Sequence, residues 1–193
     1  MFSWANFLTY ALITAITPGP NNILSLTNAS RFGLRRVPPV TLGMFAGFTV
    51  VTLVCTAFCG ALTSIVSAIK TPMMVLGAAY MLYLAYKTWH GGAVTEGEAH
   101  QTGFWEGFAL QFLNPKIFIY SIVSMQVYIM PVYANNIPAL GLFAVLLSAM
   151  GAVCTLMWAL FGAAFKLLFA KYAKVTNTVM ALLLVYCAVS LFL

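Results

Sequence analysis

Two short polar stretches interrupt long apolar runs of the sequence, and both combine proline with asparagine. The first consists of Thr17, Pro18, Gly19, Pro20, Asn21 and Asn22, and the second of Asn114, Pro115 and Lys116. Proline lacks a backbone N–H and its ring clashes with the preceding helical turn, so each stretch leaves backbone carbonyls unpaired. Asparagine supplies hydrogen-bond donors and acceptors, and lysine supplies a cation. These groups are suited to binding a small polar solute that carries both charges.

The composition places these stretches in a membrane. Of 193 residues, 63% are hydrophobic and 6% are charged, and the mean hydropathy is +0.98. A soluble domain carries about a quarter charged residues, so we predict an integral membrane protein in a lipid bilayer. The net charge of +6 does not indicate a nucleic-acid partner. The basic residues lie between apolar segments, where such residues orient helices in the bilayer.

Polar residues divide the chain into six apolar segments, each about long enough for a transmembrane helix. The segments run over residues 3–30, 38–69, 72–89, 103–130, 138–168 and 175–193. The only substantial hydrophilic connection is the linker 90–103, whose Gly, Glu and His content suits a flexible segment in water. We therefore predict an all-α integral membrane fold with six transmembrane helices in a single domain, residues 1–193.

Loop charge predicts the orientation. Lys70 is the only basic residue in the second connection, and the fourth connection has none. The odd-numbered connections hold or adjoin Arg31, Arg35, Arg36, Lys87, Lys166, Lys171 and Lys174. These connections should therefore be cytoplasmic, with the linker 90–103 among them and both termini on the periplasmic side. The first segment lacks a positively charged leader and is predicted to be a retained helix.

This orientation relates the two halves of the chain. The fourth helix enters the membrane from the side opposite to the first, so halves 1–90 and 103–193 would be inverted-topology repeats of three helices each. The two proline stretches lie at corresponding places, about a dozen residues into helices 1 and 4, well inside the hydrocarbon core. Paired breaks of this kind indicate a transporter's binding site, because unpaired backbone at that depth must face protein or a water-filled cavity. Simple proline kinks are the alternative.

The individual polar residues have alternative roles. Lys116 is an ionisable residue deep in a segment, so we expect it to attract a substrate carboxylate, unless its long stem carries the ammonium group to the cytoplasmic surface. Asn21 and Asn22 could bind a ligand or cap the freed helix end. Glu106 is the only acid in a predicted segment. It is the candidate for a carboxylate proton carrier, although it could also pair with a basic loop residue.

Other residues are predicted to be structural. Gly43 and Gly47 form a GxxxG pattern that allows a neighbouring helix to approach closely, with a mobile gating contact as the alternative. The sequence predicts no metal site and no cofactor, because His90 and His100 lie at or in the linker and the cysteines form no C-x-x-C pair. The segments offer no paired carboxylates and no Ser–His arrangement, so we do not predict an enzyme.

Several stretches resemble the LysE-type family of bacterial amino-acid exporters. They are TYALITAITPGPNNILSLTNASRFGLRRVPPVTLGMFAGF, GAAYMLYLAYK, FALQFLNPKI and ALLLVYCAV, and the likeness runs across essentially the whole chain. The resemblance implies a six-helix protein of the bacterial inner membrane that exports small neutral amino acids and related metabolites, such as cysteine and O-acetylserine, driven by the proton motive force. It assigns the family motifs to residues 18–22 and 114–116. The chain contains no Asp, so a coupling scheme with an intramembrane aspartate cannot be transferred.

These expectations combine into a secondary transporter that works by alternating access. A zwitterion would place its carboxylate at Lys116 and at the N–H groups of the broken helices, and its ammonium at the freed carbonyls, while the two halves rock around it. The alternative is a passive channel or pore in which Asn and Thr line a polar path. The sequence does not choose among cysteine, O-acetylserine, serine and threonine as substrates. It also leaves open whether the protein is a homodimer.

Overall fold

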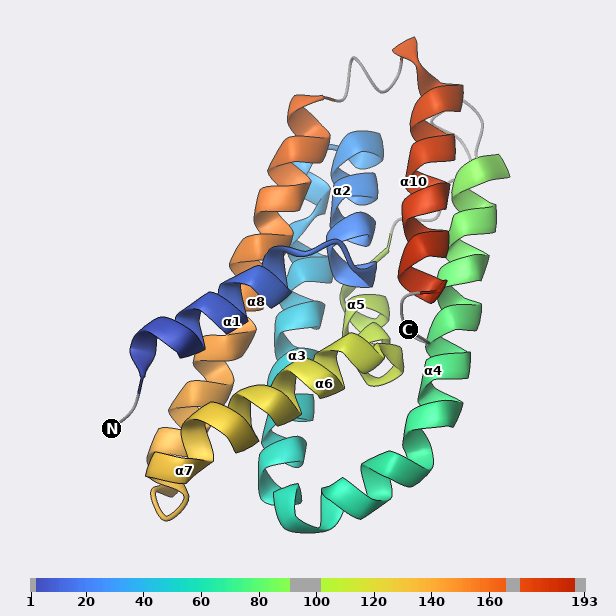
Figure 1. The fold of residues 1–193 in the computed structure, drawn as a ribbon. Coiled ribbons are helices and arrows are strands. Elements are labelled where there is room, and N and C mark those ends of the chain that lie inside the picture. The colour runs from blue at the N-terminus through green and yellow to red at the C-terminus, as the bar shows by residue number, and fades with distance from the viewer. Residues whose placement is uncertain (1–2, 91–101, 166–170, 190–193) are drawn as a thin grey trace.

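The structure is a computed structural model, and it describes residues 3–90, 102–165 and 171–189. All regular elements in these ranges are helical (Figure 1). In chain order they are α1 (Trp4–Ile16), α2 (Pro20–Phe32), η1 (Leu34–Arg36), α3 (Pro38–Ala57), α4 (Cys59–His90), α5 (Phe104–Leu113), α6 (Pro115–Val123), the π-helical turn η2 (Ser124–Ile129), α7 (Met130–Tyr133), α8 (Ile137–Ala164) and α10 (Ala173–Val189).

Both predicted helix breaks are confirmed. The first segment divides into α1, which ends at Ile16, and α2, which begins at Pro20. The fourth divides into α5 and α6, with Asn114 as the N-cap of α6 and Pro115 as its first residue. Proline is favoured at the first helical position because the N–H that it lacks would have no partner there. The prolines therefore end one helix and begin the next, which is more than a kink.

The predicted boundary between the second and third segments is wrong. The sequence placed it between residues 69 and 72, but α3 ends at Ala57 and α4 runs from Cys59 to His90 with Pro72 inside it. An interior proline can bend a helix without ending it. The chain turns instead at Phe58, whose N–H donates to the Val54 carbonyl and closes the last turn of α3.

Three of the described helical stretches are long and apolar enough to cross a membrane. They are Pro38–Ala57, Pro115–Tyr133 and Ile137–Ala164, and the shorter helices Trp4–Ile16 and Lys174–Val189 are also apolar. These stretches support a multi-pass membrane protein. The count of six transmembrane helices and the inverted repeat stay predictions.

Each broken helix packs mainly against the other half of the chain. α2 lies along α8, α5 lies along α3, and α4 and α10 pack against each other (Figure 1). Glycine residues allow the close approach of α2 to α8 and of α5 to α3. A methyl group on Gly43 would collide with the Phe104 carbonyl of α5, and one on Gly47 would lie 2.6 Å from the Phe108 carbonyl oxygen. On α8, a methyl group on Gly162 would meet the Leu26 carbonyl of α2.

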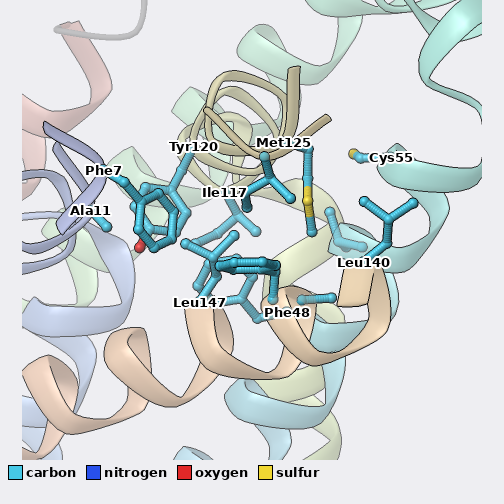
Figure 2. Close-up of a cluster of buried hydrophobic side chains, with 13 residues drawn as sticks. Phe7, Ala11, Phe48, Cys55, Ile117, Tyr120, Met125, Leu140 and Leu147 are labelled. Atoms are coloured by element: carbon cyan, nitrogen blue, oxygen red, sulfur yellow. The ribbon is translucent and has the colours of Figure 1, made fainter. Parts of the chain in front are cut away.

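The largest apolar core joins α1, α3, α6, η2 and α8 (Figure 2). Tyr120 of α6 lies at its centre with 2% of its surface exposed. The ring of Phe48 meets that of Tyr120 edge-on at 5.5 Å, and the ring of Tyr10 stacks on Tyr120 at 6.0 Å. This core holds α1 and α6 obliquely across the bundle, beside the more upright α2, α4 and α10 (Figure 1).

Candidate functional site

The two helix breaks meet at a recess that combines polar and apolar groups, which we call the central recess. The end of α1, the beginning of α2 and the beginning of α6 form it, and Phe48 of α3 together with Gly151 and Thr155 of α8 complete its wall. It contains about 380 Å³ of empty space, part of it in the open mouth. Of the predicted residues, it is lined by Gly19, Pro20, Asn21, Asn22, Asn114 and Lys116.

Side chains pair the backbone carbonyls that the first break exposes. The Asn22 amide nitrogen donates to the carbonyls of Ala15 and Thr17, both at 2.9 Å. The Trp158 indole N–H of α8 donates to the Ile16 carbonyl at 3.0 Å. Asn22 therefore acts as a cap for the freed end of α1, which was one of its two predicted roles.

Lys116 connects the two breaks. Its ammonium nitrogen donates to the Thr17 carbonyl at 2.8 Å, so a cation from the second half reaches backbone freed in the first half. The ammonium group ends at this break, beside the open mouth of the recess. Gly19 leaves the room for it, because a β-carbon at Gly19 would lie 3.1 Å from the Lys116 nitrogen.

Asn21 faces the second half of the chain through a partner that the sequence did not reveal. The Asn21 amide nitrogen donates to Gln111 Oε1 at 2.9 Å, and the Gln111 amide nitrogen donates back to Asn21 Oδ1 at 3.1 Å. Asn114 also donates to Asn21 Oδ1, at 3.4 Å. Gln111 is fully buried and makes a further bond to the Gly107 carbonyl. The sequence indicates a role for Gln111 in the site only through its position, one helical turn before Asn114.

Two further lining residues were not predicted. Thr155 of α8 donates its hydroxyl to Asn22 Oδ1 at 3.3 Å and so fixes the capping amide. Tyr120 lines the recess, and its hydroxyl is buried without a hydrogen-bond partner among the described residues. Nothing in the sequence distinguishes these two residues from the many other threonines and tyrosines of the apolar segments.

The electrostatics of the central recess favour an anionic group. The N-terminal ends of α2 and α6 both contribute to its wall, and helix N-termini carry partial positive charge. In α6 the Lys116 N–H is already bonded to the Asn114 side chain, so α6 contributes its dipole rather than a free donor. Lys116 adds a full positive charge, and no described residue of the wall is acidic. The Thr17 carbonyl and the Asn21 side-chain oxygen are acceptors close by. These donors and acceptors are the chemical complements of a carboxylate and an ammonium group.

The remaining predicted residues lie elsewhere. Thr17 and Pro18 form the break itself, while Gly43 and Gly47 lie in the contact between α3 and α5. Glu106 is not in the recess wall, and its carboxylate accepts a hydrogen bond from the Gly103 N–H at 2.6 Å, at the start of α5. This contact caps the helix. A role of Glu106 in proton transfer stays a prediction.

The fold and the recess define a helical, multi-pass membrane protein with a candidate solute site where two broken helices meet. The model of the LysE type translocator family matches residues 12–193, and the chain belongs to that family. Its family is one of translocators rather than enzymes.

Curated relatives extend over nearly the full chain. A protein of Klebsiella pneumoniae is 41% identical over 184 residues, which are 95% of this chain and 93% of the relative. Proteins of Escherichia coli (strain K12) and Salmonella choleraesuis are each 41% identical over 96% of this chain and 95% of the relative. All three are named cysteine/O-acetylserine efflux protein. No solved structure matches the chain.

Proposed function

We propose that this protein is a secondary transporter of the bacterial inner membrane that exports small neutral amino acids and related metabolites of the cysteine and O-acetylserine type. The observation that carries the proposal is the contact between the Lys116 ammonium and the Thr17 carbonyl, which joins the broken helices of both halves at one recess. The efflux proteins of Klebsiella pneumoniae and Escherichia coli support this substrate class by their names and by 41% identity.

The contacts of the central recess suggest how a zwitterion binds. Its carboxylate accepts hydrogen bonds from Lys116 and from backbone N–H groups at the beginning of α2. Its ammonium takes two acceptors that are hydrogen-bonded in the structure. They are the Thr17 carbonyl, which accepts from Lys116 and Asn22, and Asn21 Oδ1, which accepts from Gln111 and Asn114. The substrate amine would replace the Lys116 ammonium at the Thr17 carbonyl, so this carbonyl would keep a cationic donor at a depth where water is scarce.

The way the broken helices are supported is the basis on which we propose alternating access. α2 packs on α8 and α5 packs on α3, so each half carries part of the other. If six transmembrane helices form two inverted repeats, the α2–α8 pair and the α5–α3 pair could rock against each other around the central recess. In this scheme both termini are periplasmic, the linker 90–103 is cytoplasmic, and the proton motive force drives export, with Glu106 as the candidate proton carrier.

The test is efflux from cells preloaded with labelled cysteine, O-acetylserine, serine or threonine, with and without an uncoupler. Lys116→Met keeps the apolar stem and removes the charge, so we expect it to abolish export while the protein remains inserted. Lys174→Met is the matched control, because Lys174 is an exposed cation of α10 outside the recess. Export that survives Lys116→Met unchanged would remove Lys116 from the site.

Counterflow separates a carrier from a pore. A carrier that alternates between two faces exchanges labelled for unlabelled solute with saturable kinetics, whereas a pore only equilibrates it. In proteoliposomes preloaded with unlabelled cysteine, we expect transient accumulation of labelled cysteine. Simple equilibration would refute alternating access, and insensitivity of net export to the uncoupler would refute proton coupling.

A further inference from the structure

A second recess lies farther along α2, toward the end of the molecule where the first connection and Thr102 are found. It lies between the C-terminal half of α2, α4 and α10, and contains about 520 Å³ of empty space. Its polar groups are Thr27, Asn28, Arg31, Thr88 and Thr102, set among isoleucine, leucine and phenylalanine side chains. We call it the Arg31 recess.

Two donors in the Arg31 recess lack partners among the described residues. Asn28 is 3% exposed, and its Oδ1 accepts a hydrogen bond from the Thr102 hydroxyl at 3.2 Å. Its amide nitrogen is buried and makes no hydrogen bond, and neither does the buried Nη2 of Arg31. Leaving a buried donor unpaired is costly, and more so for a charged one. The two residues are three positions apart on α2, so they lie on the same face of the helix.

The unpaired groups specify the chemistry of a ligand. Both are donors, and one is the Nη2 group of a guanidinium, which forms charge-assisted hydrogen bonds with carboxylates. The Thr88 hydroxyl lines the same recess and can donate as well, whereas the Thr27 hydroxyl already donates to the Ile23 carbonyl at 2.8 Å. The apolar part of the wall suits a short, uncharged side chain. A small neutral amino acid, bound through its carboxylate, satisfies all of these features.

We propose that the Arg31 recess is an entry site that binds the carboxylate of the exported amino acid before the substrate reaches the central recess. This inference rests on the proposed function. α2 connects the two sites, since Asn22 lines one and Asn28 the other, about 9 Å apart along the helix at about 1.5 Å per residue. On the predicted orientation, the Arg31 recess faces the cytoplasm, where the substrate is made.

Equilibrium binding to the purified full-length protein in phosphatidylcholine nanodiscs tests the proposal. The probes are labelled cysteine and labelled cysteamine, which is cysteine without its carboxylate. A Lys116→Met background removes the contribution of the central lysine. In this background we expect Arg31→Gln to weaken cysteine binding roughly 10-fold or more, because a charge-assisted hydrogen bond is lost, and to leave cysteamine binding unchanged.

Matched variants distinguish the loss of a binding site from a change in net charge and from misfolding. Arg35→Gln removes an exposed cation of the same connection and should leave cysteine affinity unchanged. Arg31→Lys keeps the charge without the fork and should give an intermediate affinity. Asn28→Asp keeps Arg31 and supplies an internal carboxylate, so it should abolish Arg31-dependent cysteine binding even if Arg31→Gln does not fold.

The outcomes also distinguish this proposal from the proposed function. Equal cysteine affinity with and without the Arg31 side chain overturns the entry site, even in a protein that exports cysteine. Arg31-dependent binding in the Lys116→Met background, together with no cysteine export by the wild-type protein, upholds the carboxylate site and refutes the exporter. Loss of cysteine binding when phosphatidylglycerol is added to the nanodiscs would assign the recess to a lipid phosphate and overturn the entry site.

Discussion

The reciprocal amide pair between Asn21 and Gln111 provides a quantitative test of how the two halves are joined. Asn21 is the second residue of α2 and Gln111 lies near the end of α5, and each donates one hydrogen bond to the other, at 2.9 and 3.1 Å. Gln111 is fully buried. Replacing Asn21 by Leu or Gln111 by Met keeps the approximate volume and removes one partner, while the double variant removes both.

The magnitude of the coupling follows from the two bonds. Interhelical hydrogen bonds in membrane proteins contribute about 0.6 kcal/mol each on average and about 1.7 kcal/mol at most. Two bonds therefore predict a coupling free energy of about 1.2 kcal/mol, with an upper limit of about 3.4 kcal/mol. Each single variant should cost about 1 to 3 kcal/mol, because it leaves a buried amide unpaired. The double variant should then be less destabilised than the sum of the two singles.

The assay is reversible unfolding in mixed micelles by a denaturing detergent, followed by intrinsic fluorescence, for the wild type and all three variants. A control cycle pairs Gln111→Met with Thr178→Val, because Thr178 is an exposed residue of α10 that bonds its own helix at the Lys174 carbonyl. Its coupling should be near zero. A coupling below about 0.3 kcal/mol for Asn21 with Gln111, equal to ordinary non-additivity, would refute the bonded pair.

Three further predictions concern single side chains. Gly47→Ala should lower the thermal unfolding temperature, because the new methyl group would lie 2.6 Å from a backbone carbonyl of α5. Gly141→Ala is the control and should leave the temperature unchanged, because Gly141 has open space around it. Equal shifts in the two variants would contradict the close contact. Trp158→Phe should reduce the free energy of unfolding by about 0.5 to 1.5 kcal/mol, because it removes the hydrogen bond to the Ile16 carbonyl, and an unchanged value would show that water replaces the indole. Tyr120→Phe should leave the unfolding temperature unchanged, since the hydroxyl has no partner among the described residues, but should weaken cysteine binding about 10-fold if that hydroxyl contacts the substrate. Unchanged cysteine affinity in Tyr120→Phe would exclude the hydroxyl from the site.

Local covalent chemistry explains which parts of the fold the sequence predicted well. Pro18, Pro20 and Pro115 end and restart helices through their own rings, so both breaks could be located from the sequence alone. Pro72 has the same ring but lies inside α4. Whether a proline bends or ends a helix depends on what packs around the freed carbonyls, and the sequence does not contain that information locally.

The polar contacts of the site depend on residues far apart in the chain. Asn21 and Asn22 are neighbours with the same side chain, yet Asn22 caps α1 while Asn21 pairs with Gln111, ninety positions away. The direction in which each side chain leaves the helix decides between these roles. Thr155 and Trp158 enter the site only because α8 packs along α2. Such partners follow from helix packing and could not have been predicted from residue type.

The way each helix piece is packed indicates which parts of the protein can move. α2 and α5 contact α8 and α3 through backbone carbonyls set against glycine, at Gly162 and Gly47. Contacts of this kind fix two helices at one separation, because no side chain can adjust. α1 and α6 are instead held by large apolar side chains such as Phe7 and Tyr120, which can repack by changing rotamers. We therefore expect the breaks at residues 17–19 and at Asn114 to be the hinges, with α1 moving relative to the α2–α8 pair and α6 relative to the α5–α3 pair.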